Sequence, residues 1–131
     1  MSEAEKLKKF QDLFDKNSIA HFATLMPDGT PQVTPVWVDF DGEYILINTA
    51  RGRQKDRNVR RNPRVGVEIM DPDNSAHYVQ VRGRVVEILE AGALEHAERL
   101  SRKYTGQAFG PLPEGQVRVV IKILPEHVNG Q

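Results

Sequence analysis

Residues 48–63 of the chain read NTARGRQKDRNVRRNP, from Asn48 to Pro63. They follow an apolar run, Tyr44 to Ile47, that is typical of a β-strand, and they contain a short helical pattern that Asn62-Pro63 ends. From Arg51 to Arg64 the chain carries seven cations and one acid, Asp56. This segment therefore has a local charge of +6, and the remainder of the neutral chain has a charge of −6.

A strand that leads through a glycine-containing loop into a helix forms a natural anion site. The N–H groups of the loop and of the first helical turn point toward the ligand, and arginine or lysine side chains neutralise its charge. The alternative is a basic loop that only faces water, as charge clusters commonly do. The position of this cluster, between a strand and a helix, favours a phosphate site.

The length and composition indicate a single soluble domain that spans residues 1–131. With 39% hydrophobic and 27% charged residues, the chain can build one modest core. Its formal net charge is zero, so no overall field favours nucleic acid or an anionic membrane. No apolar run approaches the length of a membrane span, and the charged N-terminal segment is unlike a signal peptide, so we expect a cytoplasmic protein.

Alternating apolar residues and turn signals predict a mainly β fold with six strands and three helices. The Pro27–Gly29 turn and the Asp41-Gly42 pair indicate that the first three strands form an antiparallel meander. Pro35, inside the second strand, marks a sheet edge or a bulge, and Gly83 permits a bend. We expect a six-stranded antiparallel barrel with peripheral helices. The predicted strands cover residues 19–25, 32–40, 43–48, 65–69, 78–88 and 117–123, with Pro125 after the last one, and the helices cover residues 2–17, the end of the basic segment and residues 93–104.

Two of the predicted strands are apolar on both faces. Val36-Trp37-Val38 and Val119-Val120-Ile121 are continuous apolar runs, whereas a barrel core covers only one face of a strand. The second face needs a helix or another subunit. We therefore expect a homodimer whose interface contains one of these two runs.

The sequence offers little catalytic chemistry of its own. It contains no cysteine, no G-x-x-x-x-G-K-[ST] loop and no G-x-S-x-G motif. Its four histidines are far apart in sequence, so no metal site is predicted. Any reactivity should therefore come from a bound cofactor.

The motifs resemble those of the split β-barrel flavin-binding family typified by pyridoxamine phosphate oxidase. The basic stretch resembles that family's phosphate-binding signature, and the similarity extends over nearly the whole chain. It includes the segments NSIAHFATL, TPVWVDFDG, YVQVRGRV and KILPEHV. The resemblance implies an FMN-binding split barrel, and it is greatest to the branch that uses the deazaflavin coenzyme F420. The substrate signature of pyridoxamine phosphate oxidase is not recognisable, so oxidation of vitamin B6 is not expected.

The same resemblance implies which residues contact the cofactor. The phosphate contacts fall on Thr49, Arg53, Gln54 and Lys55, with Asn58 behind them in the helix. The tricyclic ring would lie along Gln32, Thr34, Pro35, Val36 and Trp37, and Tyr78 would reach it from the facing subunit. Taken alone, Trp37 would be interpreted as a core or interface aromatic.

Two classes of function follow. The first is an oxidoreductase in which coenzyme F420, or alternatively FMN, passes a hydride to an unsaturated small molecule such as a tetrapyrrole, quinone or enone. The second is a non-catalytic flavin- or haem-binding module. Nucleic-acid binding ranks lowest because no aromatic residue accompanies the basic stretch. The charge favours coenzyme F420, since its polyglutamate tail could run along Arg57, Arg60 and Arg61.

Overall fold

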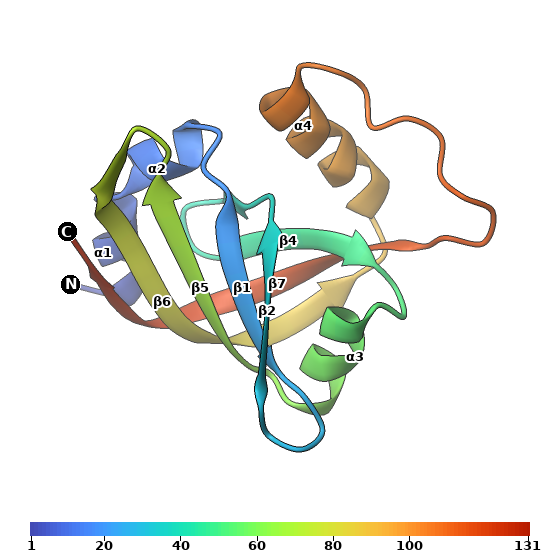
Figure 1. The fold of residues 1–131 in the computed structure, drawn as a ribbon, viewed down its shortest axis with the longest axis horizontal. Coiled ribbons are helices and arrows are strands. Elements are labelled where there is room, and N and C mark those ends of the chain that lie inside the picture. The colour runs from blue at the N-terminus through green and yellow to red at the C-terminus, as the bar shows by residue number, and fades with distance from the viewer.

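A computed structural model describes all 131 residues, as one antiparallel sheet with four helices around it (Figure 1). The helices are α1 (Glu3–Lys8), α2 (Gln11–Asp15), α3 (Gln54–Arg61) and α4 (Ala93–Thr105). The strands are β1 (Ala20–Leu25), β2 (Pro31–Val36), β3 (Asp39–Phe40), β4 (Ile45–Ala50), β5 (Arg64–Asp71), β6 (Asn74–Leu89) and β7 (Arg118–Gly130). None of the four helices has the length and apolarity that a membrane span requires.

The strand order explains why the sheet curls into an incomplete barrel. Neighbouring strands follow the order β2-β1-β5-β6-β7-β4-β3, so β2 and β3 are the two edges. Only Trp37 and Val38 separate these edges in the chain, and three residue steps span at most about 11 Å. The two edges must therefore approach each other, and the mainly β split-barrel prediction is confirmed (Figure 1).

The strand count differs from the prediction because one predicted strand divides. Residues 32–40 form β2 and β3 rather than a single strand, which gives seven strands instead of six. β2 pairs with β1 and β3 pairs with β4, both antiparallel as predicted. The three predicted strands do not form one continuous meander, because β2 and β3 lie at opposite ends of the strand order. Pro35 lies on an edge strand, as its position suggested, where proline is best tolerated in a sheet.

The last strand is longer than predicted. β7 continues through Pro125 to Gly130, although the sequence placed Pro125 beyond its end. β4 pairs with β7 only as far as Ile123, so Pro125 lies where β7 has a single neighbour and the proline is tolerated. The predicted irregularity at Gly83 is present, since the β6–β7 register shifts between Arg82 and Gly83.

The core lies inside the curled sheet, and the two N-terminal helices close one end of it. Leu7, Leu13 and Phe14 contribute to a cluster of 18 buried apolar residues. The single N-terminal helix predicted from the sequence is interrupted, because Phe10 has non-helical backbone angles between α1 and α2. On the outside of the sheet, α4 packs against β7.

This packing bears on the two alternative dimer surfaces predicted from the sequence. Val119 and Ile121 are fully buried, and Val120 is 6% exposed, all within one protomer. α4 is the helix that covers the second apolar face of β7, so this strand needs no second subunit. Val38 is also fully buried, which leaves Val36 and Trp37 as the partly exposed members of the two apolar runs.

Candidate anion-binding cavity

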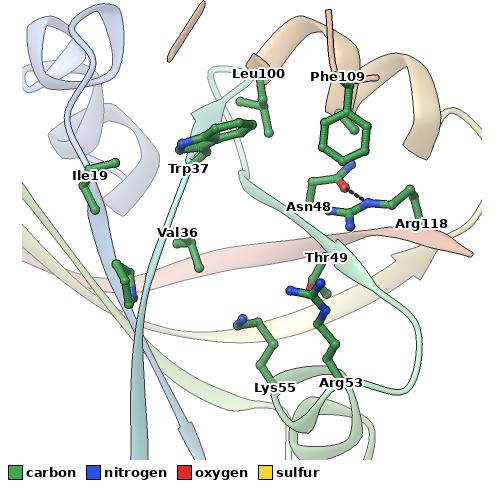
Figure 2. A pocket seen from close by; sticks show the side chains of 12 residues that line it. Ile19, Val36, Trp37, Asn48, Thr49, Arg53, Lys55, Leu100, Phe109 and Arg118 are labelled. Atoms are coloured by element: carbon green, nitrogen blue, oxygen red, sulfur yellow. Dashed lines mark hydrogen bonds between the residues drawn. The ribbon is translucent and has the colours of Figure 1, made fainter. Parts of the chain in front are cut away.

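A cavity of about 350 Å³ opens where β2, β4 and the start of β7 meet the N-terminus of α3 and one face of α4 (Figure 2). The basic stretch contributes its lower wall, and Trp37, at the connection between the sheet edges, contributes part of its upper wall. Twelve residues line it: Ile19, Pro35, Val36, Trp37, Asn48, Thr49, Arg53, Lys55, Ala97, Leu100, Phe109 and Arg118.

Three cations face this cavity, and no acidic residue lines it. Arg53 and Lys55 rise from the start of α3, and Arg118 enters from the first residue of β7 (Figure 2). Burial lowers the pKa of Lys55 from its usual value, and repulsion by Arg53 and Arg118 lowers it further. Burial and Arg53 likewise lower the pKa of Arg118. Because like charges in a partly buried site repel one another, this arrangement favours a bound anion.

Four of the five remaining cations of the basic segment, all except Arg64, are held by groups of the chain itself. Arg51 pairs with Glu90 at 2.6 Å, and Arg60 pairs with Asp56 at 2.9 Å. Arg57 donates to the carbonyl oxygen of Gly52, and Arg61 donates to that of Leu25. The proposed use of Arg57, Arg60 and Arg61 for an acidic tail is therefore not supported, since all three already have acceptors.

The loop that presents Arg53 and Lys55 is fixed by one buried carboxylate. Asp56 is 1% exposed, and its Oδ2 accepts the N–H of Gly52 at 2.8 Å. Gly52 has a φ of 90°, a left-handed conformation that glycine adopts without strain. Arg53 is the N-cap of α3, and no side chain caps the helix, so its first-turn N–H groups are available to an anion.

Gln54 and Asn58 serve the scaffold rather than the cavity. Asn58 is fully buried, and its Nδ2 donates to Thr24 Oγ1 at 3.0 Å. Its Oδ1 accepts from Gln54 Nε2 at 2.8 Å, and Gln32 Oε1 lies 3.5 Å from its Nδ2. These contacts attach α3 to β1 and β2, and none of Gln32, Gln54 and Asn58 lines the cavity. The resemblance implied cofactor contacts for Gln32 and Gln54, and the structure places both beside Asn58 instead.

The apolar wall of the cavity is built around Trp37. Its ring stacks on Tyr104 with 5.3 Å between centroids and 7° between planes. Tyr104 Oη donates to the Ser18 carbonyl oxygen at 2.7 Å and accepts the Val38 N–H at 3.2 Å, so α4 holds the connection between the sheet edges in place. Thr34 lies on the same face of β2 as Val36, and its buried hydroxyl has no hydrogen-bond partner.

The structure brings together most of the predicted site and adds residues that the sequence did not reveal. Of the residues for which cofactor contacts were predicted, Pro35, Val36, Trp37, Thr49, Arg53 and Lys55 line the cavity. Thr34 on β2 and Tyr78 near the start of β6 do not line it. The additional residues come from segments far apart in sequence: Ile19, Asn48, Ala97, Leu100, Phe109 and Arg118. A lone cation at the start of an apolar strand was the available signal for Arg118, but Phe109 lies in a glycine- and proline-rich loop without periodicity.

A second group of polar side chains could in principle bind a metal ion. Potential ligand atoms of Asp12, Asp71 and His77 lie within 4.8 Å of one another. None of these three residues lines the cavity. Each of the three already has a partner in the chain. His77 Nε2 lies 2.8 Å from Asp12 Oδ2, and Asp71 pairs with Lys16 at 3.0 Å. The cluster is therefore accounted for by internal contacts.

Comparison with known proteins agrees with this geometry. Residues 7–131 match the pyridoxamine 5'-phosphate oxidase family. The chain belongs to this family. A solved structure described as an F420 reductase is 35% identical, with a TM-score of 0.83, and the match covers 92% of this chain and 96% of that one.

Two further members of the same fold extend the comparison. A conserved hypothetical protein of Mycobacterium tuberculosis is 28% identical with a TM-score of 0.74, over 99% of this chain and 84% of that one. The general stress protein 26 of Bacillus anthracis is 21% identical with a TM-score of 0.71, over 94% and 91% of the two chains. At that identity the likeness concerns the fold alone. The pyridoxamine 5'-phosphate oxidase family match covers residues 7–131, which include all seven strands.

The lowered pKa of Lys55 predicts a pH dependence for anion binding by this family member. A bound anion raises the pKa of Lys55 again. The affinity for the anion is therefore greatest below the pKa that Lys55 has in the free protein, and it falls as the pH rises through that value. We expect the affinity for a phosphate-bearing ligand to fall as the pH rises through the alkaline range. In the Lys55→Arg variant it should stay flat, because arginine remains charged throughout this range. Equilibrium titrations at intervals across the range test this, and equal slopes in both proteins would contradict it.

Proposed function

We propose that this chain is an oxidoreductase that binds coenzyme F420 in the cavity and reduces an unsaturated small molecule such as a tetrapyrrole, quinone or enone. The observation that carries the proposal is the set of three unneutralised cations beside an apolar wall. A ligand that combines an anionic chain with a flat ring system fits both surfaces. The similarity to a protein described as an F420 reductase supports this choice within the family.

The residues present fit a phosphate-bearing tricyclic cofactor. Arg53, Lys55 and Thr49 would hold its phosphate, together with the uncapped N-terminus of α3. The wall formed by Pro35, Val36 and Trp37 would contact the ring. When bound, the deazaflavin supplies the hydride.

The protein itself contributes binding, orientation and exclusion of water. Apart from its cations, the cavity wall contains no titratable side chain, so no carboxylate or histidine is in place as a general acid or base. Apolar contacts with Leu100 and Phe109 would keep water away from the ring.

FMN is the alternative cofactor, because it also combines a phosphate with a tricyclic ring and would use Arg53 and Lys55 in the same way. Arg118 favours coenzyme F420. It adds a third positive charge to those of Arg53 and Lys55 in the cavity wall. A ligand that carries carboxylates in addition to its phosphate could neutralise all three charges.

Parallel titrations with the two cofactors test the proposal. We expect coenzyme F420 to bind more tightly than FMN, followed by loss of the reduced-cofactor signal when a quinone, a tetrapyrrole or an enone is added. Omitting the protein gives the background rate. Binding of FMN at nanomolar concentration without binding of coenzyme F420 would make the chain a flavoprotein, and binding without turnover of any acceptor would make it a non-catalytic module.

We further propose that the active form is a homodimer in which a second copy covers the β2 edge. Val33 is 59% exposed and Ile19 is 41% exposed on this side of the sheet, and the edge of β2 has no paired strand. The cavity also opens along Ile19, Pro35 and Val36, so a second copy could add Tyr78 to it as the resemblance implies.

A charge introduced at this edge should separate the subunits. Val33→Glu is expected to yield monomers at micromolar concentration, because a carboxylate would be buried in an interface larger than about 1,000 Å². Val86→Glu provides the matched control, since Val86 is 41% exposed on β6, and it should leave the dimer intact. Sedimentation velocity measures both. A wild-type protein that sediments as a monomer would refute the dimer.

A further inference from the structure

A chain of polar groups runs behind the cavity, from Arg118 to a buried histidine on α4. Arg118 Nε donates to Asn48 Oδ1 at 2.9 Å, as Figure 2 shows. Asn48 Nδ2 lies 3.2 Å from His96 Nδ1, and His96 Nε2 lies 3.4 Å from Asp39 Oδ2. His96 is 2% exposed, so its ring is closed off from water. None of these histidine contacts is needed to build α4 itself.

The partners of Asn48 determine which way its amide points. Arg118 Nε can only donate, so the atom facing it is the amide oxygen. The Ala93 carbonyl can only accept, and it lies 2.8 Å from Nδ2. The second hydrogen of Nδ2 is then directed at His96 Nδ1. This ring nitrogen must therefore accept, and the proton of the neutral ring must lie on Nε2, facing Asp39.

The same network restricts the guanidinium of Arg118. Its Nε is held by Asn48, its Nη1 lies 3.3 Å from Gln116 Oε1, and its carbon lies 5.0 Å from the centroid of the Phe109 ring. A guanidinium held on three sides presents its remaining N–H groups in a fixed direction. Because Arg118 lines the cavity, that direction decides how it meets an anionic group.

We propose that His96 is a positioning residue for this anion site. Acting through Asn48, its Nδ1 lone pair fixes the orientation of the Arg118 guanidinium. The ligand group that Arg118 would meet is a carboxylate or phosphate of the cofactor. The inference rests on the proposed function only in requiring that an anionic ligand enters the cavity.

A double-mutant cycle tests the proposal, with coenzyme F420 and FMN as the probes. His96→Leu should weaken binding roughly tenfold in the wild-type background, the effect of one charge-assisted contact. In an Arg118→Met background the same change should weaken binding by less than about twofold, because the guanidinium that His96 positions is absent. His96→Asn keeps an acceptor near the position of Nδ1 and should retain most of the affinity. Equal losses in both backgrounds would show a general packing effect and overturn the proposal.

Nitrogen NMR of the free protein gives a readout that does not depend on either cofactor. His96 should show an unprotonated Nδ1 and a protonated Nε2 at pH 7.5, and the Arg118 Nε–H should exchange slowly. In His96→Leu that slow exchange should be lost while the thermal transition stays cooperative. A protonated Nδ1, or an Arg118 signal unchanged in the variant, would refute the positioning role. If neither cofactor binds, the proposed function fails, and these signals still decide the role of His96.

Discussion

Replacing Lys55 with alanine is expected to weaken cofactor binding roughly 10- to 150-fold, more than any other single cation change in the basic segment. A hydrogen bond to a charged group contributes ~1.5–3 kcal/mol, which corresponds to this range of dissociation constants. Lys55 has no acidic partner in the chain and lines the cavity, so its charge is free for the ligand. Arg57, Arg60 and Arg61 are already hydrogen-bonded within the protein and should matter less directly.

The control for this prediction is Lys9→Ala. Lys9 is an exposed cation outside the cavity, and its loss changes the net charge by the same amount. Equilibrium titration of both variants at two salt concentrations separates local contact from long-range attraction, since salt screens the latter over a Debye length of about 10 Å at 0.1 M. Equal effects of the two substitutions would mean that the basic segment acts only through its overall field.

Replacing Gly83 with alanine should destabilise the protein by about 3 kcal/mol or more, the largest stability effect we expect from adding one methyl group. A Cβ at this position would lie 2.3 Å from the carbonyl oxygen of Leu124 and 3.2 Å from Ile123 Cγ2. The backbone of β7 would have to move at the bulge where β6 and β7 change register. Overpacking of a buried site costs 1–3 kcal/mol and more when backbone must shift.

The matched control is Gly66→Ala on β5 of the same sheet. Its added Cβ would meet Ala23 Cβ at 3.7 Å, an ordinary van der Waals distance. Thermal unfolding should show a fall of roughly 10 °C for Gly83→Ala and a change of only a few degrees for Gly66→Ala. Similar transitions for the two variants would show that the bulge can relax at low cost.

The fold was largely predictable because its signals are local. Alternating apolar residues, the Asp71–Asn74 turn and the proline after Asn62 each act within a few residues, so most strands and the extent of α3 agree with the prediction. The errors occur where distant segments decide the outcome. The passage of the chain from β2 to β3 depends on the closure of the whole sheet, and the path of β7 beyond Ile123 depends on where β4 stops pairing with it.

The same distinction applies to the cavity. Arg53, Lys55 and Thr49 belong to one continuous stretch, whose charge and position made the site recognisable from the sequence alone. Arg118 and Phe109 reach it through the return of β7 and the loop before it, which no spacing in the sequence reveals. The sequence also overestimated the number of free cations, because Arg57 and Arg61 donate to main-chain carbonyl groups and to the side chains of Gln54 and Asn58.

The two-residue connection between the sheet edges gives the ligand an influence on folding. Trp37 belongs both to this connection and to the cavity wall, so a ligand packed against it and against Lys55 would bind only the closed barrel. Such a ligand adds its own binding free energy to that of folding, about 2.7 kcal/mol at a hundredfold excess over its dissociation constant. The cofactor would thereby stabilise the approach of the two sheet edges to each other. Protection of the β2 and β3 amides against hydrogen exchange would then rise with the cofactor concentration.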